Sequence, residues 1–275
     1  MVPPLQCRHG PLARTPQGRQ GVVTLSFPDS HCHLQDERFA DEMAKVLARA
    51  REAGVATVLL PGTDPDTSER AASLAEAHGL WFSAGTHPED PARHDEGRIR
   101  ALLSHPRCVA VGEIGFDYHF LPYDKEAQDR LFRSQIRLAL EAQLPIVIHN
   151  RDADRDTVRV LREEGSPGGV FHCFGGDREC LEAALELGFF ISFAGNLTYP
   201  KAAFRELAPL VPRERLLVET DAPYLSPVPF RGKPNEPART ALVLAELACL
   251  RGEEVAELGA ACLDNFWHCF PKATA

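Results

Sequence analysis

Two histidines separated by one residue, His31 and His33, follow a short apolar run, Val22–Phe27. Residues two apart on an extended strand point to the same side, so both imidazoles can reach one metal ion. Buried ionisable groups at the ends of strands often mark functional sites. Four further residues with metal-binding side chains also stand at the ends of apolar runs, and we expect them to complete the ligand set: Glu113, His149, His172 and Asp221.

Most of these positions also have an ordinary structural alternative. A chain of 275 residues with 11 histidines can place two of them this close by chance. Glu113 could be a buried acid paired with Arg or Lys, although its own segment offers no such partner. His149 could close a buried strand, and Asp221 could cap a turn. Side chains that can bind metal recur at the ends of several expected strands, and this favours the metal interpretation.

The donor types indicate which metals to expect and how many. Four imidazoles and two carboxylates suit Zn, Mn, Fe or Ni better than Ca, which prefers oxygen ligands. Six ligands exceed one tetrahedral zinc shell but fit two ions roughly 3.5–4 Å apart that clamp the attacking and leaving oxygens of a displacement. Glu113 is the simplest bridging ligand, because Gly112 and Gly115 let backbone or metal approach closely. We therefore expect two divalent ions, with Mg, Mn, Zn and Ni as candidates.

The elements that must position these side chains alternate along the chain. Between the apolar runs lie Ala-, Leu-, Glu- and Arg-rich segments with helical spacing, several of which begin with acids such as Asp64, Asp124 and Asp177 that are suited to capping. Strands are expected at 23–30, 55–61, 81–85, 108–115, 145–149, 169–173, 189–194 and 216–220. Helices are expected at 39–52, 67–78, 125–142, 155–163, 178–187, 202–207, 236–250 and 253–267.

Eight such units predict an α/β fold, a closed (β/α)8 TIM barrel, with its active site at the C-terminal ends of the strands. All six candidate ligands would meet there. An open doubly wound sheet is the competing fold, but it would carry a Gly-rich turn after the first strand. Residues 31–35 occupy that place and contain no glycine.

Composition sets the remaining limits. The chain is 44% hydrophobic and 25% charged, as soluble globular proteins are, and no apolar stretch reaches the length of a membrane span. Its net charge of −9 argues against a broad basic surface for duplex nucleic acid. We expect residues 1–20 to form a flexible N-terminal arm and residues 21–275 to form one hydrolase domain. The scattered cysteines, with no CxxC pair, favour a cytoplasmic protein.

Several segments together resemble the TatD-type metal-dependent deoxyribonucleases, a branch of the amidohydrolase-like barrels. The resemblance spans about residues 27–270 and rests on residues 29–34, 112–118, 145–151, 172–174, 219–225 and 231–237. It implies that one ion takes His31, His33, Glu113 and Asp221, and that the other takes Glu113, His149 and His172.

Several positions depart from the family pattern, among them Gly175 and His268, which stand where Ser and Arg are more usual. The family usually has His-Pro-His where this chain has His87-Pro88-Glu89. That is a substrate-side position, so the change leaves substrate preference open. Gln35 replaces a residue that is more commonly Asp.

The expected function is that of a metal-dependent hydrolase of ester bonds, a deoxyribonuclease acting 3′–5′ on single-stranded DNA ends by a two-metal mechanism. Asp221 would accept the proton of the attacking water, Glu113 would serve both ions, and Glu219 would orient a ligand from behind. The candidate substrate contacts are His87, Arg151, Tyr224, Arg231 and Lys233, although Arg231 and Lys233 could be solvated surface charges.

Phe116, Tyr118 and Phe174 could stack on bases or simply pack. An amide or ester hydrolase, such as an aminoacyl-tRNA deacylase, would use the same metal centre, and a non-catalytic metal-stabilised binding module is a third possibility. No membrane association is expected, and a monomer is favoured.

Overall fold

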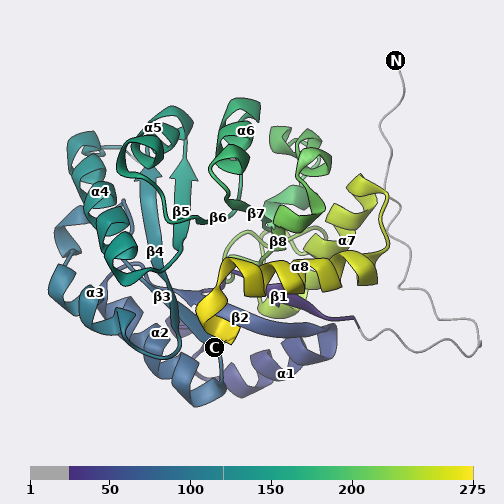
Figure 1. Cartoon of the computed structure of the whole chain (residues 1–275). Helices are drawn as coiled ribbons and strands as arrows, with labels where there is room; N and C mark the ends of the chain where they lie inside the picture. The colour runs from purple at the N-terminus through teal and green to yellow at the C-terminus, as the bar shows by residue number, and fades with distance from the viewer. Residues whose placement is uncertain (1–24, 120, 275) are drawn as a thin grey trace, which may run out of the picture.

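The computed structural model describes residues 25–119 and 121–274. Eight parallel strands follow one another in chain order around a barrel whose outside is covered by helices (Figure 1). The Ser30 N–H donates to the Val218 carbonyl over 3.1 Å, so the first and last strands meet. The TIM barrel predicted from the sequence is confirmed. Its strands are β1 (Phe27–Asp29), β2 (Val55–Pro61), β3 (Trp81–Ala84), β4 (Cys108–Asp117), β5 (Ile146–Arg151), β6 (Gly169–Phe171), β7 (Phe190–Phe193) and β8 (Leu216–Val218).

The helices begin where the sequence offers capping side chains. Asp64, Asp124 and Asp177 each accept a hydrogen bond from the backbone N–H three residues later, as the acidic helix starts predicted. The α-helices are α1 (Met43–Ala53), α2 (Pro65–His78), α3 (Glu96–Leu103), α4 (Lys125–Ala142), α5 (Asp154–Glu164), α6 (Arg178–Glu186), α7 (Thr240–Arg251) and α8 (Val255–Cys269).

Two helices differ from the sequence prediction in more than their bounds. The short α3 was not predicted, because its eight residues bury only Ile99 and Leu103 and so show too little periodicity. The helix predicted at 202–207 is instead a pair of 3₁₀ turns, Ala203–Glu206 and Ala208–Leu210. Pro209 lacks the N–H that a continuing α-helix would need there.

The N-terminal end of the barrel is closed by the C-terminal part of the chain. Phe266 and Phe270 pack against inward-facing residues of the strands, among them Val109 and Leu217. The Asn265 amide donates to the carbonyl of Arg213, just before β8, and to that of Leu216, the first residue of β8. With this end plugged, any open cavity must lie at the C-terminal ends of the strands, where barrel enzymes place their active sites.

Within the described residues, no helix combines the length and apolar character needed to span a bilayer. The predicted arm at residues 1–20 lies outside the described residues, and its boundary with the barrel domain stays a prediction.

Candidate metal centre

The six side chains predicted to bind metal meet at the C-terminal end of the barrel. They come from five places that are far apart in the sequence. His31 and His33 follow β1 directly, and the others are Glu113 in β4, His149 in β5, His172 just after β6 and Asp221 three residues after β8.

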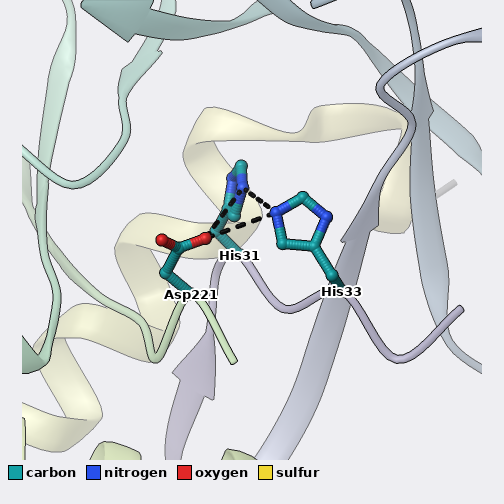
Figure 2. Close-up of side chains that lie close together, drawn as sticks. All are labelled: His31, His33 and Asp221. Carbon is teal, nitrogen blue, oxygen red and sulfur yellow. Dashed lines mark hydrogen bonds and ion pairs between the residues drawn. The ribbon is translucent and has the colours of Figure 1, made fainter. Parts of the chain in front are cut away.

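The first half of this centre consists of His31, His33, Asp221 and one oxygen of Glu113. His31 Nε2 and His33 Nε2 lie 3.2 Å apart, and Asp221 Oδ1 lies 3.7 Å and 3.3 Å from them (Figure 2). Glu113 Oε2 approaches His31 Nε2 to 3.3 Å and His33 Nε2 to 3.9 Å. Four donor atoms thus face one small volume.

The second half consists of His149, His172 and the other oxygen of Glu113. Glu113 Oε1 lies 2.8 Å from both His149 Nδ1 and His172 Nε2, and these two nitrogens are 3.3 Å apart. One carboxylate therefore presents one oxygen to each half, as a bridging ligand does.

The distance between the two imidazole nitrogens in each half matches the spacing of atoms that share a metal ion. Two ligands bound at about 2.0–2.1 Å to a tetrahedral ion are about 3.3 Å apart. The nitrogen–nitrogen separations of 3.2 Å and 3.3 Å agree with that value. Among the described residues, no Lys or Arg is paired with Glu113 or Asp221, so the ordinary buried ion pair does not account for Glu113. The donor set fits two divalent ions.

Two carboxylates behind the second half fix the orientation of its imidazoles. The His149 Nε2–H donates to Asp117 Oδ2 over 2.9 Å, and the His172 Nδ1–H donates to Glu219 Oε1 over 3.2 Å. Each bond places the proton on the outer nitrogen and leaves the inner nitrogen free to bind metal. The orienting position predicted for Glu219 agrees with this geometry. Asp117 was not predicted to have a role, although it stands four residues after Glu113 on the same strand.

Electrostatics keep the central carboxylates ionised. Burial favours the neutral acid, but the imidazoles of His172 and His31 outweigh it and hold the pKa of the Glu113 carboxyl well below its usual range. The pKa of Asp221 is also lowered, because its hydrogen bond with His33 overcomes the effect of burial. Both side chains are therefore ready to act as ligands near neutral pH.

Gly115, two residues after Glu113, allows β4 and β5 to lie close together at the site. Gly115 has a φ of +142°, and a Cβ there would lie 2.0 Å from the backbone oxygen of His149. Any side chain would push apart the two strands that carry Glu113 and His149. The glycine was predicted to permit close approach, and the group that approaches is the backbone of β5.

A cavity of about 1240 Å³ opens above the two halves. Three of the predicted substrate contacts, His87, Arg151 and Tyr224, line it. Arg231 does not line it and instead lies over the ring of Tyr199, with its guanidinium carbon 4.4 Å from the ring centroid. Lys233 is likewise absent from the cavity wall, so the structure does not bring either residue into the cavity.

The three aromatic residues considered for base stacking differ in accessibility. Phe116 and Phe174 are buried in the core, with 0% and 2% exposure, and cannot stack on a substrate. Tyr118 lines the cavity and stacks on Tyr123, with ring centroids 4.8 Å apart. Tyr224, 49% exposed, contacts the ring of His33 edge to face at the opposite rim.

His87 lies beside the second half as a neutral imidazole. Burial, followed by the nearby His149, lowers the pKa of His87 to about 3. Its Nδ1 accepts the backbone N–H of Glu89 over 3.2 Å, which leaves the proton on Nε2. His87 Nε2 is 3.7 Å from Glu113 Oε1. His87 can therefore donate a hydrogen bond into the cavity.

Comparisons with known proteins agree with this geometry. The sequence model of the family described as TatD related DNase matches residues 28–271. The chain belongs to the TatD family. It is 40% identical over 240 residues to the uncharacterized metal-dependent hydrolase YabD of Bacillus subtilis, covering 84% of this chain and 94% of that protein. A TatD family relative from Enterobacter lignolyticus, named a 3′-5′ ssDNA/RNA exonuclease, is 39% identical over 238 residues, covering 82% and 92%.

A solved TatD family structure shares the fold. The crystal structure of YJJV, a TatD homologue from Escherichia coli, superposes with a TM-score of 0.85 at 33% identity, covering 89% of this chain and 98% of that one. The chain is thus a metal-dependent hydrolase of the TatD family, built on the TIM barrel that the sequence predicted.

Proposed function

We propose that this protein is a 3′–5′ exonuclease that hydrolyses phosphodiester bonds at single-stranded DNA ends with two divalent metal ions. The observation that carries the proposal is the single carboxylate of Glu113, whose two oxygens face two separate groups of imidazoles. The relative named a 3′-5′ ssDNA/RNA exonuclease supports the nucleic-acid substrate and the polarity.

Different residues of the site would carry out different parts of the hydrolysis. Bound divalent ions would lower the pKa of a water and polarise the phosphoryl oxygen. Asp221 Oδ1 faces His31 and His33, while its other oxygen points away from both rings (Figure 2). That second oxygen can accept the proton of the attacking water. Asp117 and Glu219 hold the imidazoles of the second half in place, and His87 Nε2–H can donate to the phosphate.

The charge of the cavity makes metal binding necessary for a polyanionic substrate. Eleven acidic residues and five basic residues line the cavity. Two divalent ions would return four positive charges where the phosphate must lie. We therefore propose that single-stranded DNA binds only to the metal-loaded protein. Arg151 and the rim residue Tyr224 then provide a cation and an aromatic face for a nucleotide.

The cavity also bears on the alternatives. An apolar pocket with one opposite charge would favour a small ester or amide, whereas this cavity is wide and lined by many charged side chains. A binding module without activity would tolerate the loss of a ligand, but all six candidate ligands are present. We retain the proposals of a monomer and of a cytoplasmic location from the sequence.

One assay separates these functions. Metal-free protein is reconstituted with Mg²⁺, Mn²⁺, Zn²⁺ or Ni²⁺. It is then offered a 5′-labelled single-stranded DNA, an RNA of the same sequence, the corresponding DNA duplex and an aminoacyl ester. We expect a ladder of products shortened from the 3′ end, formed only with metal and blocked by phosphorothioate linkages at the 3′ terminus. Hydrolysis of the ester with every oligonucleotide intact would refute the proposal and support the deacylase alternative.

A further inference from the structure

The two halves of the centre differ in the groups behind their imidazoles. In the second half, both outer nitrogens donate to carboxylates, those of Asp117 and Glu219. In the first half, the buried His31 Nδ1 has no hydrogen-bond partner among the described residues. His33 Nδ1 faces an amide nitrogen, Gln35 Nε2, at 3.4 Å. The first half therefore lacks the acceptors that the second half has.

Gln35 is fixed in this position by a second contact. It lies in the turn after His33, is 8% exposed, and donates from Nε2 to the carbonyl oxygen of Pro61, at the end of β2, over 2.5 Å. Its Oε1 is buried and has no partner in the described structure. Exchanging the amide oxygen and nitrogen would place Oε1 against the Pro61 oxygen, so that two acceptors would be in contact. The contact with Pro61 thus directs a donor at His33.

This arrangement conflicts with metal binding by His33. The inner nitrogen, Nε2, is the atom that faces His31 and Asp221. A neutral imidazole that binds metal through Nε2 carries its proton on Nδ1, and that N–H needs an acceptor. At Gln35 it meets an N–H donor instead. The tautomer that Gln35 favours, with the proton on Nε2, must be given up when an ion binds.

We propose that Gln35 is a positioning residue that weakens the hold of His33 on an ion in the first half of the centre. The inference rests on the proposed dinuclear site. A carboxylate at position 35 could accept the His33 Nδ1–H, which the Gln35 amide nitrogen cannot do. Losing such an outer partner typically lowers metal affinity by about 10- to 100-fold. The first-half ion is therefore more easily exchanged in this chain than it would be with an acid at position 35.

The test measures zinc binding without reference to activity. Metal-free native chain, Gln35→Glu and Gln35→Asp are titrated with Zn²⁺ against a chromophoric chelator, and bound zinc is counted by mass spectrometry. Gln35→Asp is included because its shorter side chain draws back from Pro61 if the longer one disturbs folding. Gln35→Met removes the amide donor without adding an acceptor. Gln143→Glu, at an exposed position at the end of α4, controls for the added charge.

We expect one of the two zinc dissociation constants to fall by about 10- to 100-fold in an acidic variant at position 35, with no such gain in Gln35→Met or Gln143→Glu. In a His31→Ala background, which removes a first-half ligand, the gain should disappear. The inference alone would be overturned if each protein binds two zinc ions and neither dissociation constant differs between the native chain, Gln35→Glu and Gln35→Asp. A native chain that binds no zinc or other divalent ion would overturn the proposed function itself.

Discussion

Asp117→Asn tests whether the outer partner of His149 controls metal affinity. Each carboxylate oxygen of Asp117 has its own donor, since Oδ1 accepts the backbone N–H of His119 over 2.8 Å and Oδ2 accepts the His149 Nε2–H over 2.9 Å. Burial opposes ionisation, but the hydrogen bond with His149 outweighs it and lowers the pKa of Asp117 to about 2. The native side chain is therefore a charged acceptor at neutral pH.

An asparagine of the same shape can satisfy only one of these donors. Its single oxygen pairs with either the His119 N–H or the His149 Nε2–H, and its NH₂ group then faces the other. Losing one hydrogen bond to a charged acceptor costs about 1.5–3 kcal/mol. At about 1.4 kcal/mol per tenfold change, this corresponds to an affinity loss of about 10- to 100-fold for the ion of the second half.

The assay is zinc titration against a chelator, with thermal unfolding in chelator as a check on the metal-free fold. Asp264→Asn, at an exposed position on α8, is the matched control. We expect Asp117→Asn to lose affinity for one ion and to regain activity at high zinc. Native affinity for both ions in a folded variant would show that Asp117 does not act on the metal through His149.

Further predictions test the other parts of the site. The double variant His31→Ala/His33→Ala should lower the number of bound ions by at least one and abolish hydrolysis; unchanged turnover would remove the argument for the first half. Asp221→Asn should keep much of the metal yet slow hydrolysis by about 10²- to 10⁴-fold, and a normal rate would deny it the role of base. Gly115→Ala should lower the melting temperature and the activity together, because its methyl group meets the β5 backbone; a native melting temperature would contradict this. Deleting residues 1–20 should change neither the melting temperature nor the activity. A large drop in melting temperature would show that the fold depends on these residues.

The sequence was sufficient to predict the barrel and the set of side chains that meet at its C-terminal end. Both followed from one regularity, because each strand is an apolar run and the side chains with chemistry stand where the runs end. The strand predicted at 55–61 and the helix at 125–142 have the predicted bounds. Short elements were less predictable, since α3 offers too few turns to show a period.

What the sequence could not supply was the set of contacts behind the ligands. Asp117 and Gln35 are two polar residues among many, and only the paths of β4 and of the loop after β1 place them against His149 and His33. The sequence also did not show which side chains are accessible to a substrate. Phe116 and Tyr118 stand two residues apart, yet only Tyr118 lines the cavity. The sequence also could not show that the ring of His94 is partly buried and hydrogen-bonded to Thr86.

Anomalous diffraction from crystals of the zinc-loaded protein would show directly whether Glu113 joins two metal ions. We expect two peaks roughly 3.5–4 Å apart, one among His31, His33 and Asp221 and the other between His149 and His172, with Glu113 in contact with both. A single peak, or ions bound away from Glu113, would contradict a dinuclear centre.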